Sequence, residues 1–495
     1  MNIKQAKEEI KHTVMAYLAK DAQGEYRIPA IRQRPILLMG PPGIGKTQIM
    51  EQIAAECKIG LVAYTITHHT RQSAVGLPMI KEESFEGKTY SVTEYTMSEI
   101  IASIYRKMKK TGQKEGILFI DEINCVSETL APTMLQFLQC KTFGNQAIPE
   151  GWLIVAAGNP PEYNKSVRDF DMVTLDRVRY LNIEADYKVW KEYAREKHLH
   201  NAILSYLELR QKNFYRVEAD VDGIRFVTAR GWEDLSNLMQ VYEEMDLPVD
   251  EGVIREFIHH EDVAEDAAAY FELYRKYRDD YGITDILAGR IRPETFARIY
   301  VASFDERLSV VNLLLDGLSA FFVKVQEKKK ITDNWYEFLK EYQRHLKEGE
   351  APADCYQALL EEKMAMVEAE KQAELCTKAQ AAGWEQIFAL WKENMPDKGL
   401  DAKESFAQAK TGFDIQREAL EESEQDASDA LEHAFDFMEQ AFEDGEEMVV
   451  FVTELTLSPE AAMFLAEHTC DRYMTYNEQL LIGKRKRELL SELKR

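Results

Sequence analysis

The chain has 495 residues, of which 45% are hydrophobic, enough to form the cores of more than one domain. Its 86 acidic and 61 basic residues leave a net charge of −25, which argues against broad, sequence-independent binding of nucleic acid. The charged N-terminus lacks the apolar segment of a signal peptide, no uninterrupted apolar run approaches the ~18 residues of a membrane span, and the six cysteines form no CxxC pair. We therefore expect a cytoplasmic protein with neither a disulfide framework nor a cysteine metal site.

Short apolar segments alternate with helical segments in the first half of the chain. Strands are predicted at residues 35–39, 60–67, 116–120, 152–157 and 180–185. A helix is predicted directly after the first of them, at residues 46–57. Continuous apolar strands separated by helices are typical of a parallel sheet covered on both faces, so the predicted fold class is α/β.

Two glycine-containing turns interrupt this alternation. Residues 84–92 and 141–149 each resemble a β-hairpin, with Glu86-Gly87 and Gly144-Asn145 near the tips. Either segment taken alone could equally be a surface loop.

The segment after the second predicted strand contains His68, His69 and Arg71. In an extended chain adjacent side chains point to opposite faces, so the two histidines are poor joint metal ligands. The segment could line a pore, contact a substrate or form a structural loop, and we assign no chemistry to it.

From about residue 186 onward the pattern is helical, and Thr228 is the expected N-cap of one helix. Residues 421–447 contain twelve acidic side chains and no Lys or Arg. The same stretch carries apolar residues at helical spacing, which predicts a helix with one buried face and solvated acids. These residues are Leu431, Phe435, Met438 and Phe442.

Residues 449–457 are the most strand-like segment of the C-terminal half. A helix is predicted to start directly afterwards, with Ser458 as N-cap and Pro459 in the first turn. The basic cluster near the C-terminus is expected to be a solvated helix end.

Residues 40–47 read GPPGIGKT and match the pattern G-x-x-x-x-G-K-[ST] between a predicted strand and a predicted helix. Glycines allow backbone N–H groups to converge on a phosphate, and the start of the helix adds partial positive charge. Lys46 can reach the terminal phosphates of ATP, and the Thr47 hydroxyl can bind Mg²⁺. The predicted nucleotide-binding residues are Gly40, Pro41, Pro42, Gly43, Ile44, Gly45, Lys46, Thr47 and Gln48.

Three polar residues follow two other predicted strands. Asp121 and Glu122 come after the strand at 116–120, and Asn159 follows the strand at 152–157. Ligands bind at the carboxyl ends of parallel strands, so Asp121 is a candidate Mg²⁺ ligand. Glu122 could accept a proton from an attacking water, and Asn159 could orient that water without adding charge.

In this order, the three motifs resemble the nucleotide site of AAA+ ATPases. Residues 40–47 are similar to Walker A, Asp121 and Glu122 to Walker B, and Asn159 to sensor 1. The two hairpins, together with TLDRV and FVTARGWEDLSNL, make residues 25–245 similar to the MoxR-like branch of that superfamily.

The resemblance implies a domain organisation. A P-loop NTPase core of the AAA+ type, with a parallel sheet and an N-terminal helix, is expected at residues 1–185. A helical lid is expected at residues 186–290, followed at 291–495 by an acidic, mainly helical region that could bind a partner.

The resemblance also implies roles for single residues. Arg230 matches the sensor 2 arginine that reaches the γ-phosphate, and Ile28 lies where such ATPases contact adenine. Arg177 matches the arginine finger that completes a neighbouring subunit's site, although Arg179 could serve instead. A local salt bridge between Arg177 and Asp176 is the alternative interpretation.

The leading functional hypothesis is a ring-forming, Mg²⁺-dependent ATPase, expected as a hexamer, that remodels or matures a partner complex. The resemblance to MoxR-like ATPases implies a partner with a von Willebrand factor A domain. A nucleotide-controlled assembly scaffold with slow turnover is the second hypothesis. A DNA-directed motor is a third, disfavoured by the net charge.

Overall fold

The computed structural model describes residues 1–480 except 69–71, 73, 75, 144–145, 164–166, 168–169, 220–222, 374 and 377. The predictions on His69, Arg71, Gly144-Asn145 and the basic C-terminal cluster lie outside the described residues, as does the side chain of His68. The chain divides into two compact units. The first comprises Met1–Trp190, Tyr215–Gly231 and Glu368–Thr377, and the second Lys191–Phe214, Trp232–Val367 and Lys378–Arg495.

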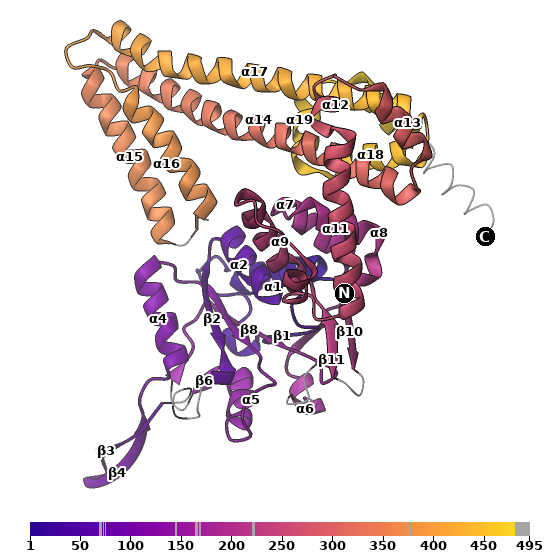
Figure 1. Ribbon diagram of the computed structural model, residues 1–495. Helices are drawn as coiled ribbons and strands as arrows, with labels where there is room; N and C mark the ends of the chain where they lie inside the picture. Colours follow the sequence, from indigo (N-terminus) through magenta and orange to yellow (C-terminus); the bar gives the residue numbers. More distant parts are fainter. Residues whose placement is uncertain are drawn as a thin grey trace, which may run out of the picture. The chain divides into compact units, whose positions relative to one another are not determined.

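A parallel sheet of five strands forms the centre of the first unit (Figure 1). Its strand order is β2-β5-β8-β1-β9, and every neighbouring pair is parallel. All five predicted strands are therefore confirmed. The bounds are β1 Ile36–Met39, β2 Gly60–Thr65, β5 Gly116–Asp121, β8 Trp152–Gly158 and β9 Arg179–Asn182.

Helices cover both faces of this sheet. Along β1, Ile36 and Leu38 pack with α1 and α2, whereas Leu37 and Met39 pack with α4 and α5. Successive side chains of a strand point to opposite faces, so an uninterrupted apolar strand supplies two cores at once. The four helices are α1 Ile3–Leu18, α2 Lys46–Cys57, α4 Glu99–Thr111 and α5 Ala131–Cys140.

Both predicted hairpins are present. Strands β3 (Pro78–Phe85) and β4 (Lys88–Tyr95) pair antiparallel around Glu86 and Gly87, which both have positive φ angles, of 52° and 80°. This turn matches the twist of the two strands. The second hairpin is short, with β6 at Thr142–Phe143 and β7 at Gln146–Ala147.

A third hairpin contradicts the prediction that the chain is helical throughout from residue 186. Strands β10 (Arg216–Ala219) and β11 (Ile224–Val227) pair antiparallel. Each has four residues, too few for a period-two pattern to stand out, and their pairing supplies hydrogen bonds that local periodicity does not reveal. The remaining short elements of the first unit are η1 Ala30–Arg32, η2 Ile66–His68 and α6 Met172–Leu175.

The described part of the second unit is built mainly of helices (Figure 1). Two long helices, α14 (Phe304–Lys347) and α17 (Ala402–Phe442), lie side by side, and α15 and α16 join them at one end. Three of the boundaries between the two units fall within helices, in α7, α9 and α15. The other elements that begin from residue 187 onward are α7 Tyr187–Glu196, α8 Asn201–Leu209, η3 Gln211–Asn213, α9 Ala229–Glu244, α10 Glu251–Arg255, α11 Glu261–Tyr281, α12 Ile283–Leu287, α13 Pro293–Val301, α15 Pro352–Gln372, α16 Lys378–Glu393, α18 Glu446–Leu457 and α19 Pro459–Glu467.

The acidic stretch at residues 421–447 behaves as predicted. All four apolar residues at helical spacing are buried, and they lie on α17: Leu431, Phe435, Met438 and Phe442. Helix α19 begins at Pro459, and the Ser458 side chain accepts a hydrogen bond from the Ala461 amide, as expected of an N-cap.

The predicted strand at 449–457 is wrong, because this segment lies in helix α18. The residues it buries recur at helical spacing, and the helix satisfies its backbone hydrogen bonds without a partner strand. The burial of one helical face therefore outweighs the strand preference of the β-branched residues in this segment. The buried face consists of Met448, Phe451, Val452 and Leu455.

Among the described helices, α14 is long and apolar enough to pass a test for a membrane span, and the bent pair α18–α19 passes it jointly. Half of the apolar window in α14 is buried inside the protein, and helices that do not span a membrane can pass the same test. This is weak support for a membrane span.

Candidate active site

The loop between β1 and α2 carries the glycine-rich motif. Gly43 and Gly45 have positive φ angles, of 72° and 89°, which glycine adopts without steric cost. A Cβ atom on Gly40 would lie 2.7 Å from the Ile183 carbonyl oxygen. The loop thus needs glycine for its own backbone path and for a close approach to the residue that follows β9.

Lys46 opens α2 and is almost fully buried, at 8% exposure. Its Nζ donates hydrogen bonds to the carbonyl oxygens of Gly40 at 2.9 Å and Pro41 at 2.8 Å, and to Oδ1 of Asn159 at 2.8 Å. Burial lowers the pKa of Lys46 to about 8, against the opposing effect of the Asp121 carboxylate. The ammonium is thus held at the mouth of the loop.

Thr47 and Asp121 form the second contact of the site. The Thr47 hydroxyl donates to Oδ2 of Asp121 at 3.1 Å. Asp121 is the last residue of β5, and Thr47 is the second residue of α2. A hydroxyl and a carboxylate so placed are oxygen ligands of the kind that Mg²⁺ prefers.

Glu122 follows β5 in a left-handed conformation, with φ of 56°. Its backbone N–H donates to Oδ1 of Asp121 at 2.9 Å. Positive φ at a non-glycine residue is strained, and such strain gathers at functional sites. The extended backbone of β5 therefore ends at Asp121, and the chain turns directly after it.

Asn159 is held by a residue to which the sequence assigned no role. The Asn124 side chain donates from Nδ2 to the Asn159 carbonyl at 2.7 Å and accepts from the Asn159 amide at 3.3 Å. Asn124 is 3% exposed, and a Cβ on Gly158 would lie 2.6 Å from its Oδ1. The position of Asn124, three residues after Asp121, is the feature of the sequence that could have indicated a role at the site. Its two hydrogen bonds join the segment after β5 to the segment after β8, so they can be recognised only in the folded structure.

Thr228 and Arg230 lie against the glycine loop. The Arg230 amide donates to the Gly43 carbonyl at 3.1 Å, and a Cβ on Gly43 would lie 3.1 Å from the Thr228 Cβ. The Thr228 hydroxyl accepts from the Gly231 amide at 3.2 Å, which confirms its capping role. The exposed Arg230 side chain also contributes to the lowered pKa of Lys46, after the larger effect of burial.

Tyr215 is a second residue to which the sequence assigned no role. Its hydroxyl donates to the Pro42 carbonyl at 2.9 Å, and burial raises its pKa. This contact links the start of β10 to the glycine loop. A lone tyrosine between a helix and a strand carries no sequence signal for such a role.

The two arginines of TLDRVRYL have different surroundings. Arg179 begins β9 and contacts α1, through Thr13 at 2.5 Å and through the Glu9 carboxylate. Arg177 lies between α6 and β9, is exposed, and contacts Gln139. In the described part of the chain it forms no ion pair with Asp176.

Hydrogen bonds join Lys46 to Asn159 and Thr47 to Asp121 directly. Among the described contacts none links Ile28 or Arg177 to this group. Ile28 is half-buried against the core that contains α1 and α2, and its carbonyl accepts from Gln33 Nε2 at 2.9 Å.

The remaining predicted loop residues, Pro41, Pro42, Ile44 and Gln48, lie in or beside the glycine loop. A Cβ on Gly45 would lie 3.1 Å from the Gln48 Oε1 atom, so this side chain folds over the start of α2.

Residues 36–172 match the model of the family described as "ATPase family associated with various cellular activities (AAA)". No curated protein matches the chain. The family match and the five-stranded parallel sheet define an α/β P-loop NTPase fold and support an AAA+ ATPase. The match begins at β1 and ends at the start of α6, so the second unit lies outside it.

Proposed function

We propose that this chain hydrolyses ATP with Mg²⁺ and uses the cycle to remodel or mature a partner protein complex. The observation that carries the proposal is the convergence of Lys46, Thr47, Asp121 and Asn159 on the glycine loop. The donors fit the nucleotide, because loop amides and an ammonium suit phosphate oxygens. Thr47 and Asp121 fit Mg²⁺, which would neutralise charge on the transferred phosphoryl group.

Within this proposal, Glu122 accepts the proton of the attacking water and Asn159 orients that water. Asn124 holds Asn159 in place through two hydrogen bonds. Arg230 contacts the γ-phosphate from the start of α9, and Ile28 contacts adenine. The proximity of Arg230 to the glycine loop supports its assignment.

We further propose that subunits form a ring, expected as a hexamer, in which Arg177 acts on the neighbour's nucleotide. Arg177 is exposed, whereas Arg179 is occupied by contacts to α1. The exposed arginine is therefore the better candidate for a finger in trans. AAA proteins commonly assemble as oligomers, which agrees with this reading.

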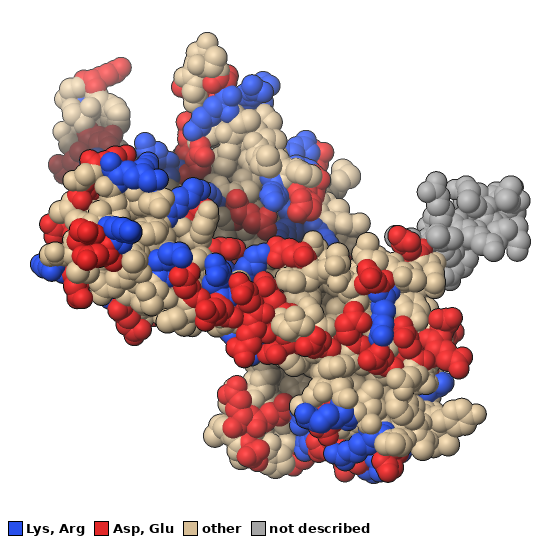
Figure 2. Space-filling view, turned by 90° about the horizontal axis from the view of Figure 1, so that it is seen from above, with Lys and Arg blue, Asp and Glu red and all other residues tan. Residues whose placement is uncertain are grey.

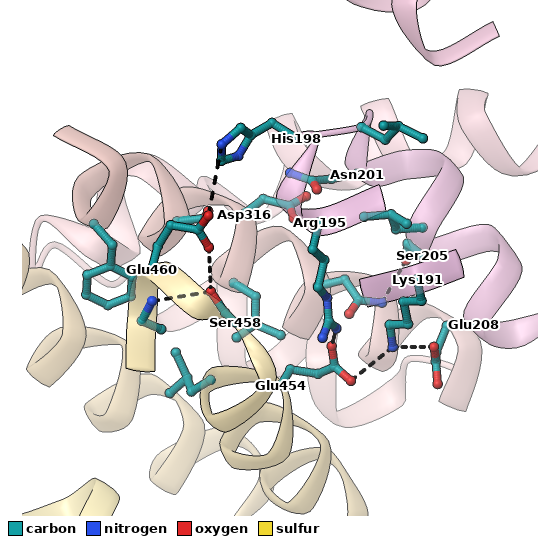
Figure 3. Close-up of a pocket in the computed structure, with 18 residues that line it drawn as sticks. Lys191, Arg195, His198, Asn201, Ser205, Glu208, Asp316, Glu454, Ser458 and Glu460 are labelled. Atoms are coloured by element: carbon teal, nitrogen blue, oxygen red, sulfur yellow. Dashed lines mark hydrogen bonds and ion pairs between the residues drawn. The ribbon is translucent and has the colours of Figure 1, made fainter. Parts of the chain in front are cut away.

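The proposed lid, residues 186–290, and the C-terminal region, residues 291–495, contribute helices to the second unit. Figure 3 shows Glu454 of α18 between Lys191 and Arg195 of α7. Lys191 Nζ lies 3.0 Å from a Glu454 oxygen, and both side chains are largely buried. This buried ion network would transmit a movement of α7 to α18.

Two further polar contacts support the same coupling within the second unit. Asn312 of α14 donates to the Ser205 hydroxyl of α8 at 2.8 Å, and the hydroxyls of Tyr270 in α11 and Ser309 in α14 lie 2.9 Å apart. We propose that the lid and the paired helices α14 and α17 respond to nucleotide together. We also propose that the chain is a MoxR-like ATPase and that its partner carries a von Willebrand factor A domain.

Two alternatives make different predictions. A nucleotide-controlled scaffold would bind its partner in the presence of ATP but turn over slowly. A DNA-directed motor would need a basic surface, and on the face in Figure 2 lysine and arginine are interspersed with larger groups of acidic side chains. That face therefore lacks the broad basic surface that contacts to nucleic-acid phosphates require.

The test combines turnover with partner capture. Full-length protein is purified, and phosphate release is measured with and without Mg²⁺ and with a partner recovered by co-purification. Partner-stimulated release supports the remodeller, and tight ATP-dependent association without turnover supports the scaffold. Absence of ATP binding would overturn the proposal, and stimulation by DNA with steep salt dependence would favour the motor.

A further inference from the structure

The turn between α14 and α15 brings three potential metal ligands together. His345 lies in the last turn of α14, Glu350 in the connecting loop, and Cys355 in the first turn of α15. One ligand atom from each lies within 4.8 Å of the others. Gly349, with φ of 91°, permits the reversal of the chain. An imidazole, a carboxylate and a thiol thus converge within eleven residues.

The imidazole of His345 is paired with the carboxylate of Glu350 in this group. Its Nδ1 is buried and lies 3.0 Å from Oε1 of Glu350. A cation bound to the Nδ1 lone pair could take the same Glu350 oxygen as a second ligand, because this contact already brings both donor atoms to one point.

The thiol side of the group is enclosed. Cys355 is 5% exposed and belongs to a buried core cluster. The Glu350 oxygen, the His345 nitrogen and the Cys355 sulfur all lie within 4.8 Å of one another, so the three ligand atoms form one compact group.

A packed core positions the backbone of this turn. The Tyr342 hydroxyl donates to the Pro352 carbonyl at 3.2 Å, and the Tyr356 hydroxyl donates to the Trp391 carbonyl at 2.8 Å. Cys355 belongs to the same buried cluster as Tyr342 and Tyr356. Cys355 thus lies inside this packed core, and His345 lies about one helical turn after Tyr342, so packing lowers the entropy cost of gathering the ligands.

We propose that His345, Glu350 and Cys355 bind a divalent transition metal ion at this turn, with Zn²⁺ as the best match. Nitrogen and sulfur donors suit Zn²⁺, whereas Mg²⁺ and Ca²⁺ prefer oxygen alone. Zn²⁺ bonds of about 2.0–2.3 Å place neighbouring ligand atoms roughly 3–4 Å apart. The three ligand atoms here lie within 4.8 Å of one another, so a small adjustment of side chains would bring them to that spacing. On binding, the Cys355 thiol releases its proton to solvent and the sulfur becomes a thiolate ligand.

Among the described contacts, the positive group beside this site is Arg344. An Arg344 guanidinium nitrogen lies 3.4 Å from Nε2 of His345, and another contact joins Arg344 to Glu341 at 3.9 Å. Arg344 is an exposed side chain and can turn toward Glu341 when a cation binds. Replacing Arg344 with Ala should therefore maintain or strengthen metal binding.

The bound ion would fasten the end of α14 to the start of α15. Metal binding would therefore act as a clamp on the helical hairpin. This inference is independent of ATP hydrolysis, because no residue of the nucleotide site takes part.

The experiment titrates Co²⁺ into metal-free, full-length protein and follows the thiolate-to-metal charge-transfer absorption, with Zn²⁺ as competitor. We expect one saturable thiolate-bound Co²⁺ per chain, displaced by Zn²⁺. Cys355→Ser should remove the band, and Glu350→Gln or His345→Gln should weaken affinity at least tenfold. Cys140→Ser, which alters an exposed cysteine elsewhere, and Lys46→Ala should leave the band unchanged.

The variants keep the proposal open to refutation. Glu350 is about half exposed, so Glu350→Gln should fold even if Cys355→Ser does not. Absence of a thiolate band, a band that survives in Cys355→Ser, or unchanged affinity in Glu350→Gln would each overturn the proposal. A metal-induced rise in the melting temperature that is lost in Glu350→Gln would support the clamp.

Discussion

The ammonium of Lys46 and the side-chain oxygen of Asn159 lie 2.8 Å apart, although 113 residues separate them in the chain. One residue follows β1 and the other follows β8, and these strands are parallel neighbours. The sheet therefore brings the lysine proposed to bind phosphate and the amide proposed to orient water to the same edge.

Lys46→Ala should weaken ATP binding at least tenfold, because a charge-assisted contact to phosphate is worth about 1.5–3 kcal/mol. Equilibrium binding of a fluorescent ATP analogue measures the effect. Lys11→Ala, which removes a lysine from α1, is the matched control and should bind normally. Unchanged affinity in Lys46→Ala would count against the loop assignment.

The buried lysine also predicts a pH dependence. The pKa of Lys46 is lowered from 10.5 to about 8, so above pH 8 the folded protein loses the positive charge of this side chain and its affinity for ATP should decline. Binding measured from pH 7 to 9.5 should fall in the wild type but not in Lys46→Ala.

The same shift affects stability. Between about pH 8 and 10.5, Lys46 binds fewer protons in the folded state than in the unfolded state, so its contribution to the free energy of unfolding rises over that range.

Glu122→Gln should retain ATP binding and lose turnover by about 10²–10⁴-fold, because the amide keeps the shape but cannot accept the proton. Single-turnover phosphate release and nucleotide binding separate the two effects. Glu150→Gln replaces an exposed acid of the same unit and should be active. Normal turnover in Glu122→Gln would show that another group is the base.

Asn124→Asp should lower kcat by roughly tenfold or more while changing KM little. The carboxylate cannot donate to the Asn159 carbonyl, so Asn159 loses the hydrogen bond that positions it. A parallel fall in kcat and in nucleotide affinity would instead point to general unfolding. Thermal melting of the variant distinguishes these outcomes.

Arg177→Ala subunits should bind ATP but hydrolyse it about 10³-fold or more slowly, because a finger arginine stabilises transition-state charge. Mixing them with Lys46→Ala subunits, whose Arg177 is intact, should partly restore turnover. Arg179→Ala should instead destabilise the first unit by about 1 kcal/mol through lost contacts to α1. If mixing does not restore turnover, Arg177 does not act on a neighbouring subunit and its role is confined to its own subunit.

Glu454→Gln should lower the unfolding free energy of the second unit by about 3 kcal/mol, because it weakens a buried ion network around Lys191 and Arg195. Glu460→Gln changes an acid that lines the same pocket as Glu454 (Figure 3). It should cost less than about 1 kcal/mol, because the His198 side chain is exposed and lies 3.9 Å from the Glu460 carboxylate. Denaturant unfolding compares the two. Equal losses would contradict the proposed coupling of α7 to α18.

The sequence alone determined the nucleotide loop, the five strands and the polar residues that follow β5 and β8. These features depend on short segments, whose apolar runs and glycines carry their own structural preference. The apolar face of α17 was equally local, since four residues at helical spacing are enough to define it.

Only the tertiary structure decided the remaining features. Asn124 gains its role from hydrogen bonds between the ends of β5 and β8, and Arg179 is distinguished from Arg177 by its contacts to α1. The segment at 449–457 is β-branched by composition, yet it is helical because Phe451, Val452 and Leu455 are buried on one helical face. Such outcomes depend on residues distant in the chain, and local sequence does not contain the identity of those partners.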